Sequence, residues 1–357
     1  MRIIDRYILK KFLSTYVFVV LILVAIIVII DITERNDKFI KHQLTFVEIL
    51  PYYLAFIPYI SNLITPITVF IATVFVTSKM ASHTEIIAIL SSGVSFRRLM
   101  VPYIIGSVII GVISFFLNGW IIPEANKTRI AFQIQYLKKP YYFTERNIHI
   151  KVAPHEYIYM QSYNSNASTG FRFTLEKIEN NRLVEKLSAN RIEWDSTQNN
   201  WKLKNWDHRI ILEKNEIVTS GVLLDTAIDI HPKDFTNTYG LHETLTNKEL
   251  REFIELLKLR GDEGVAFYEI ELYVRYMAPF AALILTLMGL IVSSRKSRGG
   301  AGFQIALGFL LAFIYIILFI MSRAIADAGS INPVLGIWIP NIIFSAVGVI
   351  LYHTVPR

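Results

Sequence analysis

The residues with the most specific arrangement form a short stretch between two long apolar runs. Residues 83–100 read HTEIIAILSSGVSFRRLM, with Glu85 opening a helical pattern and Gly93 closing it. Four apolar side chains follow the carboxylate: Ile86, Ile87, Ile89 and Leu90. A loop between two spans offers this apolar face no core of its own, so the pattern predicts docking against a partner protein. A carboxylate near a helix N-terminus is also favoured by the helix dipole, which leaves a purely structural role for Glu85 open.

Catalytic motifs are absent from the sequence. It contains no GxxxxGK[ST] phosphate loop, no HExxH and no GxSxG, and its eight histidines lack metal-ligand spacing. We therefore expect no catalysis, no metal site and no cofactor in this chain. The apolar runs carry no ionisable side chain between their ends, whereas ion-coupled carriers usually need such groups. If the chain moves a substrate, we expect the energy to come from another subunit.

The hydropathy pattern defines the elements that position this stretch. The chain has 357 residues, of which 53% are hydrophobic, and a bilayer crossing needs about 20 apolar residues. Six charge-free runs are long enough: 12–30, 49–78, 99–123, 276–294, 299–322 and 328–352. The region 124–275 is polar and has no such run. The sequence therefore predicts an α+β membrane protein with six transmembrane helices and a domain inserted between spans three and four.

The distribution of Lys and Arg near the span ends predicts the orientation. With a cytoplasmic N-terminus, the inner segments carry eleven cations: Arg2, Arg6, Lys10, Lys11, Lys79, Arg97, Arg98, Arg295, Lys296, Arg298 and Arg357. The short outer loops then carry four: Arg35, Lys38, Lys41 and Arg323. Both termini are expected in the cytoplasm and the insert outside. The net charge of +7 then reflects membrane topology, and no basic patch interleaved with aromatics points to nucleic acid.

The insert shows the alternation of β-strands. Apolar residues alternate with polar ones around 148–152, 171–176 and 201–204, and turn signals separate these segments. The alternation slips at Asn205–Trp206, which we interpret as a bulge. Short amphipathic strands of this kind favour a sandwich or jelly roll. After them, Thr246 and Glu249 form a predicted capping box of a helix that Gly261 can end.

Several segments together resemble the permease subunits of the lipopolysaccharide-export ABC transporter, the LptF/LptG (YjgP/YjgQ) family. They are "DRYILKKF", "TEIIAILSSGVSFRRL", "ANRIEWDSTQNNWKLKNW", "LTNKELREFIELLKLRG", "RYMAPFAALILTLMGLIVS" and "GIWIPNIIF". The resemblance covers essentially the whole chain. It implies spans 1–3 within 1–123, a periplasmic β-jelly roll at 124–245, connecting helices at 246–275 and spans 4–6 within 276–357. "DRYILKKF" resembles the subunit of the pair that often begins "LDRYI".

The resemblance also implies partners. In the family, the loop between spans two and three is a coupling helix, here about 83–93, that docks into a cytoplasmic ATPase dimer. Glu85 matches the acid that begins this helix and Gly93 the glycine that ends it. The other implied partners are a paralogous permease subunit forming a heterodimer, a periplasmic β-jelly-roll bridge protein and lipopolysaccharide, and ATP would be bound by the ATPase.

The implied substrate, an amphiphile with phosphates and acyl chains, requires an apolar cavity and a cationic rim. The candidate cavity residues are Phe18, Ile22, Phe56, Ile60, Ile67, Phe70, Phe309, Phe313 and Ile317. Ordinary helix packing or lipid contact is the alternative for each. The candidate rim, which we expect to bind lipid phosphates, is Arg35, Lys38, Lys41 and Arg323, with Lys127 and Arg129 as further cations. The acids Asp31, Glu34 and Asp37 interleave with this rim, so a solvated loop is its alternative.

Two other functional classes remain open from the sequence. A membrane-anchored scaffold or signalling protein would use the outer β domain to bind a protein, but would not need a coupling helix. A lipid-modifying enzyme would need clustered His, Asp or Glu at the membrane surface, and the sequence offers no convincing cluster.

Overall fold

The computed structural model describes residues 3–138, 146–165, 167–212, 215–228, 230–235, 239–262, 264–294 and 300–353. The chain forms two compact units. The helical unit comprises Met1–Leu137, His242–Leu250 and Ala266–Arg357, and the β unit comprises Lys138–Leu241 and Arg251–Val265. Five cations counted for the orientation lie outside the described residues: Arg2, Arg295, Lys296, Arg298 and Arg357.

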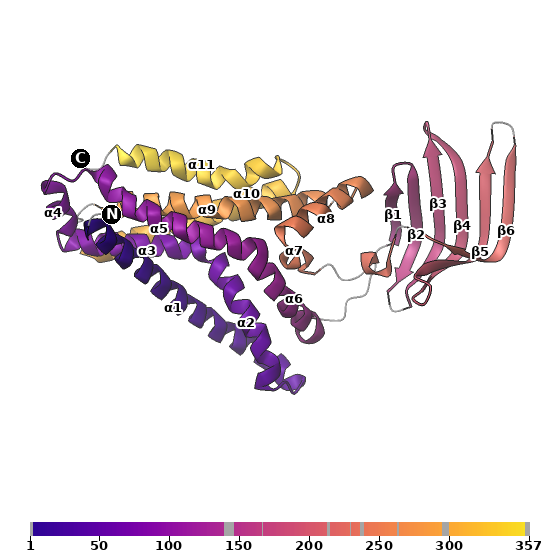
Figure 1. Ribbon diagram of the computed structural model, residues 1–357, viewed down its shortest axis with the longest axis horizontal. Helices are drawn as coiled ribbons and strands as arrows, with labels where there is room; N and C mark the ends of the chain where they lie inside the picture. The colour runs from indigo at the N-terminus through magenta and orange to yellow at the C-terminus, as the bar shows by residue number, and fades with distance from the viewer. Residues whose placement is uncertain are drawn as a thin grey trace. The chain divides into compact units, whose positions relative to one another are not determined.

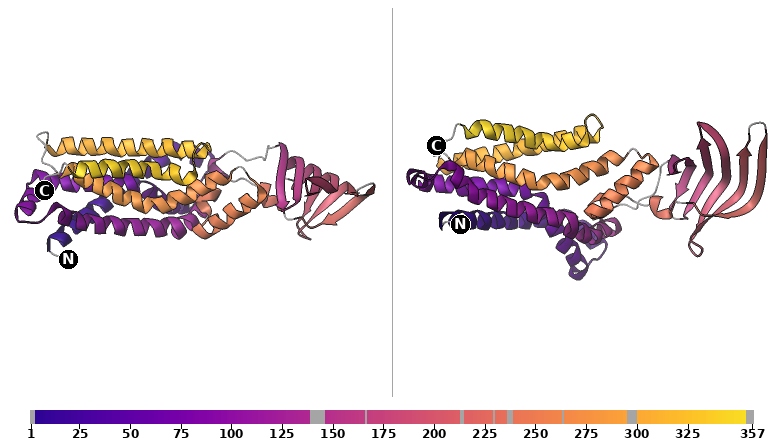
Figure 2. Two further views of the ribbon diagram at one scale, coloured as in Figure 1. Left: turned by 90° about the horizontal axis from the view of Figure 1, so that it is seen from above. Right: turned by 45° about the horizontal axis from the view of Figure 1, so that its top comes forward.

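Seven helices of the described chain are long and apolar enough to cross a membrane. Figures 1 and 2 show them running side by side through the helical unit. They are α1 (Ile3–Lys41), α2 (Phe46–Leu63), α3 (Thr65–Ser82), the stretch Phe96–Leu137, α9 (Val265–Ser293), α10 (Gly300–Asp327) and α11 (Pro333–Tyr352).

The number seven arises because the predicted run 49–78 is divided. Only Ile64 separates α2 from α3, and its backbone is in the right-handed helical region. Pro66 follows in the first turn of α3. Because proline lacks an N–H and its ring clashes with the carbonyl four residues earlier, it interrupts the helix at this point. One residue in a near-helical conformation cannot reverse the chain, so α2 and α3 continue one crossing and the seven helices make six.

The third crossing continues beyond its predicted end as one long helical stretch. It consists of α5 (Phe96–Phe116), the π-turn η1 (Leu117–Ile121), α6 (Ile122–Phe132) and the π-turn η2 (Gln133–Leu137). Pro123 lies just after η1, and its missing N–H explains why the regular hydrogen-bond ladder is widened there. The predicted insert starts at residue 124, whereas the first strand begins at Arg146.

Close packing holds the crossings together. A Cβ on Gly106 of α5 would lie 2.6 Å from the Phe12 ring of α1, and one on Gly308 of α10 would lie 2.9 Å from Val74 of α3. Small residues let helices approach in this way, and packing of this kind drives helix association in lipid. The central core lies around the fully buried Phe12 and Phe70.

Among the described residues, three shorter helices and one 3₁₀ turn complete the helical elements: α4 (Glu85–Ser91), α7 (Leu241–Thr244), α8 (Asn247–Arg260) and η3 (Pro232–Phe235). The predicted capping box of α8 is confirmed. The Thr246 N–H donates to Glu249 Oε2 at 2.8 Å, and the Glu249 N–H donates to Thr246 Oγ1 at 3.3 Å. The bonds that the Glu249 carboxylate accepts from the Thr246 N–H and hydroxyl hold its pKa below the usual value. Gly261, with φ of 68°, follows the last residue of α8 as predicted.

The predicted β domain is confirmed, and it forms one six-stranded antiparallel sheet. Its strands are β1 (Arg146–Ala153), β2 (Glu156–Asn164), β3 (Thr169–Glu179), β4 (Arg182–Asp195), β5 (Asn200–Ile211) and β6 (Glu216–Thr226). They pair in chain order, so within the described residues the predicted jelly roll takes the form of an open meander with β1 and β6 at its edges. The strands lie in one curved layer (Figure 2).

Along one line that crosses the strands, the side chains do not alternate regularly between the two faces of the sheet. Buried or core-packed residues are three positions apart in four strands, in the pairs Met160 and Tyr163, Gly170 and Phe173, Ala189 and Ile192, and Leu203 and Trp206. Asn205 has φ of 51° and drops out of the ladder, yet the pairing register is the same on both sides of it. The predicted bulge at Asn205–Trp206 is therefore wrong, because a left-handed residue causes the slip without an extra residue.

Candidate functional site

The short helix α4 joins α3 to α5 where the sequence predicts it. Thr84 precedes it with φ of 59°, and Gly93 follows it with φ of 85°. Glycine reaches this region without steric cost, so Gly93 suits the sharp exit from the helix. These two left-handed residues give the seven-residue helix its sharp entry and exit.

The carboxylate of Glu85 contacts the first turns of α1. Tyr7 donates its hydroxyl to Glu85 Oε2 at 3.2 Å, and Lys11 Nζ lies 3.4 Å from Glu85 Oε1. Lys11 also donates to the Tyr7 hydroxyl at 2.8 Å. The side chains of Glu85 and Lys11 are about a quarter exposed. This triad joins α4 to α1, so Glu85 has a structural role whatever else it contacts.

The apolar face of α4 packs against the chain itself. Ile86 is only 2% exposed, and Ile89 and Leu90 pack against the same core. The expectation that this face finds no core within the chain is therefore wrong, because α4 folds back onto the helices it connects. Ile87 is the exception, with 52% of its surface exposed.

The first candidate rim residue, Arg35, is held by a buried acid. Its Nε lies 2.7 Å from Asp31 Oδ1, one helical turn away on α1. Asp31 is 8% exposed and also accepts hydroxyl hydrogen bonds from Tyr53 at 3.1 Å and Tyr52 at 3.4 Å. The arginine therefore satisfies a buried carboxylate.

The other rim residues differ in their surroundings. Lys38 donates to the Leu137 carbonyl at 2.7 Å. Arg323 on α10 lies 2.9 Å from Glu271 of α9 and 3.8 Å from Asp327. Lys41 is exposed, and no ion pair or hydrogen bond of its side chain is found in the described part of the chain.

The candidate cavity residues fall into two groups. Phe56 and Phe70 are 6% and 0% exposed and belong to the chain's own core, so their placement in a cavity wall is wrong. Ile60 and Ile67 are half-buried. The remaining five are exposed on two helices: Phe18 and Ile22 of α1, and Phe309, Phe313 and Ile317 of α10.

Two buried arginines anchor the segment 242–247 in the helical unit. Arg129 is 4% exposed, pairs with Glu243, and lies 4.0 Å from the centre of the Tyr59 ring. Arg275 is 5% exposed and donates to the carbonyls of His242 at 2.6 Å and Leu245 at 2.8 Å. Its third acceptor is Asn247 Oδ1, at 3.1 Å. Burial lowers the pKa of His242, so this imidazole stays neutral.

No local sequence pattern indicates these roles. Arg129 follows the third apolar run as one of the further cations for lipid phosphate, and Arg275 stands directly before an apolar run, where a cation indicates topology. Lys127, the other such candidate, lies 2.6 Å from Glu124 at the surface.

The chain matches one family model over residues 6–354, the one described as "Lipopolysaccharide export system permease LptF/LptG". No curated protein matches the chain.

Proposed function

The chain belongs to the LptF/LptG family of lipopolysaccharide-export permeases, and we propose that it is the permease subunit of an ABC transporter that extracts lipopolysaccharide from the inner membrane. In this proposal a separate cytoplasmic ATPase dimer supplies the energy and binds the ATP. A paralogous permease subunit completes a heterodimer, and a periplasmic bridge protein receives the lipid. The observation that carries the proposal is the family match, which extends over almost the whole chain rather than over one domain.

The helix α4 would be the element that docks on the ATPase. Its position between two crossings, its sharp entry and exit and the exposed Ile87 support this role. With both termini in the cytoplasm, α4 lies on the cytoplasmic side. Because Glu85 is held by Tyr7 and Lys11, a force on α4 would be transmitted directly to α1.

The lipid would be held between this chain and its paralogue. The exposed apolar side chains of α1 and α10 that were predicted for the cavity would contact acyl chains, since exposing each CH₂ to water costs about 0.8 kcal/mol. The rim cations would bind the lipid phosphates. Arg35 and Arg323 already pair with acids, so either of them alone would add little to phosphate binding. Binding would therefore need these two arginines together with Lys38 and Lys41, and the acyl chains held in the apolar cavity.

The β unit would pass the lipid on through a partner β domain. Strand β6 lies at the edge of the sheet, and four of its apolar residues are at least half exposed: Ile217, Val218, Val222 and Leu223. An exposed apolar edge strand is a template for strand addition. The bridge protein would therefore pair with β6.

The proposal is tested by purifying the tagged chain from its native membrane and identifying what accompanies it. We expect a nucleotide-binding subunit, a second permease of the same family and lipopolysaccharide. Recovery of the chain with periplasmic proteins but without a nucleotide-binding subunit would instead support a scaffold.

Three variants then examine α4. We expect Ile87→Asp to abolish ATPase recovery, since it places a charge in the proposed interface. Glu85→Gln and Lys11→Met break the same contact with α1 from its two sides. If Glu85 also contacts the ATPase, Glu85→Gln reduces recovery more than Lys11→Met. If Glu85 only anchors α4, the two variants behave alike.

A further inference from the structure

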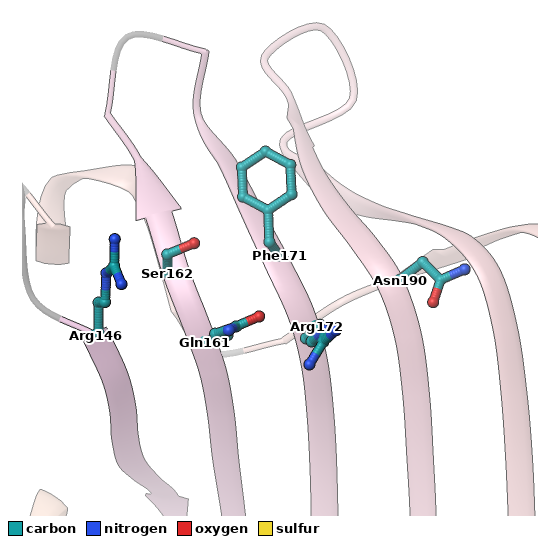
Figure 3. A pocket seen from close by; sticks show the side chains of 6 residues that line it. All are labelled: Arg146, Gln161, Ser162, Phe171, Arg172 and Asn190. Atoms are coloured by element: carbon teal, nitrogen blue, oxygen red, sulfur yellow. The ribbon is translucent and has the colours of Figure 1, made fainter.

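A polar pocket of about 490 Å³ lies on the sheet of the β unit, lined by side chains of four neighbouring strands. Figure 3 shows the six residues that line it: Arg146, Gln161, Ser162, Phe171, Arg172 and Asn190. Two of these residues are arginines, three are neutral hydrogen-bonding residues, and none is an acid. The pocket therefore offers donors and positive charge without a competing carboxylate.

The transverse irregularity of the sheet builds this pocket. The register aligns Asn147, Gln161, Arg172, Asn190 and Asn205 in one row across β1 to β5. Three of them have a left-handed backbone, namely Asn147 at 57°, Arg172 at 50° and Asn205 at 51°. We call this row the crease.

The crease brings two consecutive rows of side chains to the same face. On a strand that crosses the crease, the core-packed residues on its two sides are three positions apart, so two consecutive residues lie between them. These two residues belong to the crease row and to the adjacent row of Arg146, Ser162 and Phe171, and both point away from the core. In a regular strand consecutive side chains point to opposite faces. This explains how the neighbours Gln161 and Ser162, and likewise Phe171 and Arg172, line one pocket.

The backbone of Arg172 is the unusual feature. Asparagine adopts the left-handed region readily, whereas arginine rarely does. A residue held in this conformation within a paired strand is a sign of a functional constraint. The conformation places the Arg172 guanidinium in the pocket beside the neutral donors.

The charges around the pocket leave two cations available. Arg191 lies 3.3 Å and Lys204 lies 2.7 Å from the Glu193 carboxylate, so these two cations share one acid. Neither Arg146 nor Arg172 has an ion pair or hydrogen bond to any other residue that the structure describes. The two arginines lie on β1 and β3, roughly 10 Å apart across β2. Their long side chains can converge on one ligand above Gln161 and Ser162.

We propose that this pocket binds a phosphate group. A guanidinium presents paired donors that match phosphate oxygens, and charge-assisted bonds of this kind are the strongest hydrogen bonds in proteins. The amides of Gln161 and Asn190 and the hydroxyl of Ser162 supply further donors. The phosphate belongs to a free anion or to a lipid headgroup, and the site stands independently of the proposed transport function.

The test uses the full chain in nanodiscs and two probes. The first is inorganic phosphate, titrated calorimetrically into nanodiscs of neutral lipid. The second is a phosphomonoester lipid in vesicles that also contain neutral lipid. We expect Arg146→Gln and Arg172→Asn each to weaken phosphate binding about tenfold, since each removes a charge-assisted contact. Asparagine retains the left-handed backbone at position 172, so this variant removes the guanidinium without disturbing the crease.

Arg182→Gln is the matched control, because Arg182 is an exposed arginine of β4 outside the pocket. Binding of inorganic phosphate that both pocket variants lose and the control retains supports a site for the free anion. Binding of the lipid alone with the same pattern supports a headgroup site. Equal loss in the control, unchanged binding in the pocket variants, or binding of neither probe would overturn the proposal.

Discussion

The buried and half-buried arginines of the helical unit differ in their contacts from the two arginines of the pocket on the sheet. In the helical unit every described arginine that is buried or half-buried pairs with an acid or donates to a carbonyl: Arg35, Arg98, Arg129, Arg275 and Arg323. In the pocket on the sheet, the exposed Arg146 and Arg172 have no such partner among the described residues. A charge in or near a bilayer must be satisfied by the protein, whereas a charge in water can remain available for a ligand. The comparison teaches that the buried and half-buried arginines of the helical unit hold the fold.

The largest expected effect is the loss of Arg275, which tests the structural side of this comparison. Arg275→Met removes the guanidinium that donates to the half-buried carbonyls of His242 and Leu245. Each unsatisfied buried acceptor costs about 1–3 kcal/mol, so we expect the free energy of unfolding to fall by about 3 kcal/mol or more. Equilibrium unfolding in mixed micelles measures this change. Lys41→Met is the control and should change stability by less than about 0.5 kcal/mol; equal effects would contradict the assignment.

A smaller loss of stability is expected at the rim. Arg35→Gln removes the cation that pairs with the buried carboxylate of Asp31, while the hydrogen bonds from the two tyrosine hydroxyls remain. We expect a destabilisation of about 1–2 kcal/mol. The double variant with Asp31→Asn should cost less than the two single variants added together, because the buried charge is then removed with its partner. Strict additivity would show that the two residues do not act as a pair.

Removing the acid beside the pocket tests whether free cations there bind phosphate. Glu193→Gln releases Arg191 and Lys204 beside the pocket. The hydrogen bond from Lys204 holds the pKa of Glu193 below its usual value, so the wild-type carboxylate stays charged at neutral pH. We expect Glu193→Gln to strengthen phosphate binding several-fold in the same calorimetric titration. Weaker binding would mean that Glu193 orients the site rather than neutralising it.

The smallest expected effect concerns pH. Burial lowers the pKa of His242 in the folded chain, while its charged neighbours Glu243, Glu271, Arg275 and Arg323 act in opposing directions. The unfolded state therefore binds a proton more readily, and stability should decline as the pH falls below about 6.5. His242→Phe should weaken this decline while retaining an aromatic ring beside Phe267. An unchanged pH dependence in the variant would exclude His242 as its source.

The sequence predicted the elements whose patterns are local. Apolar runs marked the crossings, alternation marked the strands, and Thr246 with Glu249 marked the start of a helix, since each signal depends on near neighbours. The burial of Phe56 and Phe70 was not predictable, because an apolar residue in a span has the same pattern whether it faces lipid or another helix. The burial of Ile86 depends on α4 folding back onto the helices that it joins, which no local pattern shows. Likewise, the alignment of the crease needs the register of five strands. In the sequence, only the change of phase in the alternation at Asn205–Trp206 indicated the crease.

The central claim is that the pocket arginines bind phosphate whereas the arginines of the helical unit hold the fold. Comparing two double variants of the full chain in nanodiscs tests it most directly. Inorganic phosphate is titrated into Arg146→Gln with Arg172→Asn, and into Arg35→Gln with Arg323→Gln. The account predicts that the first pair removes measurable phosphate binding, while the second pair leaves the affinity within about twofold of wild type even though it lowers stability. Loss of binding in the Arg35 and Arg323 variant, with binding retained in the Arg146 and Arg172 variant, would contradict it.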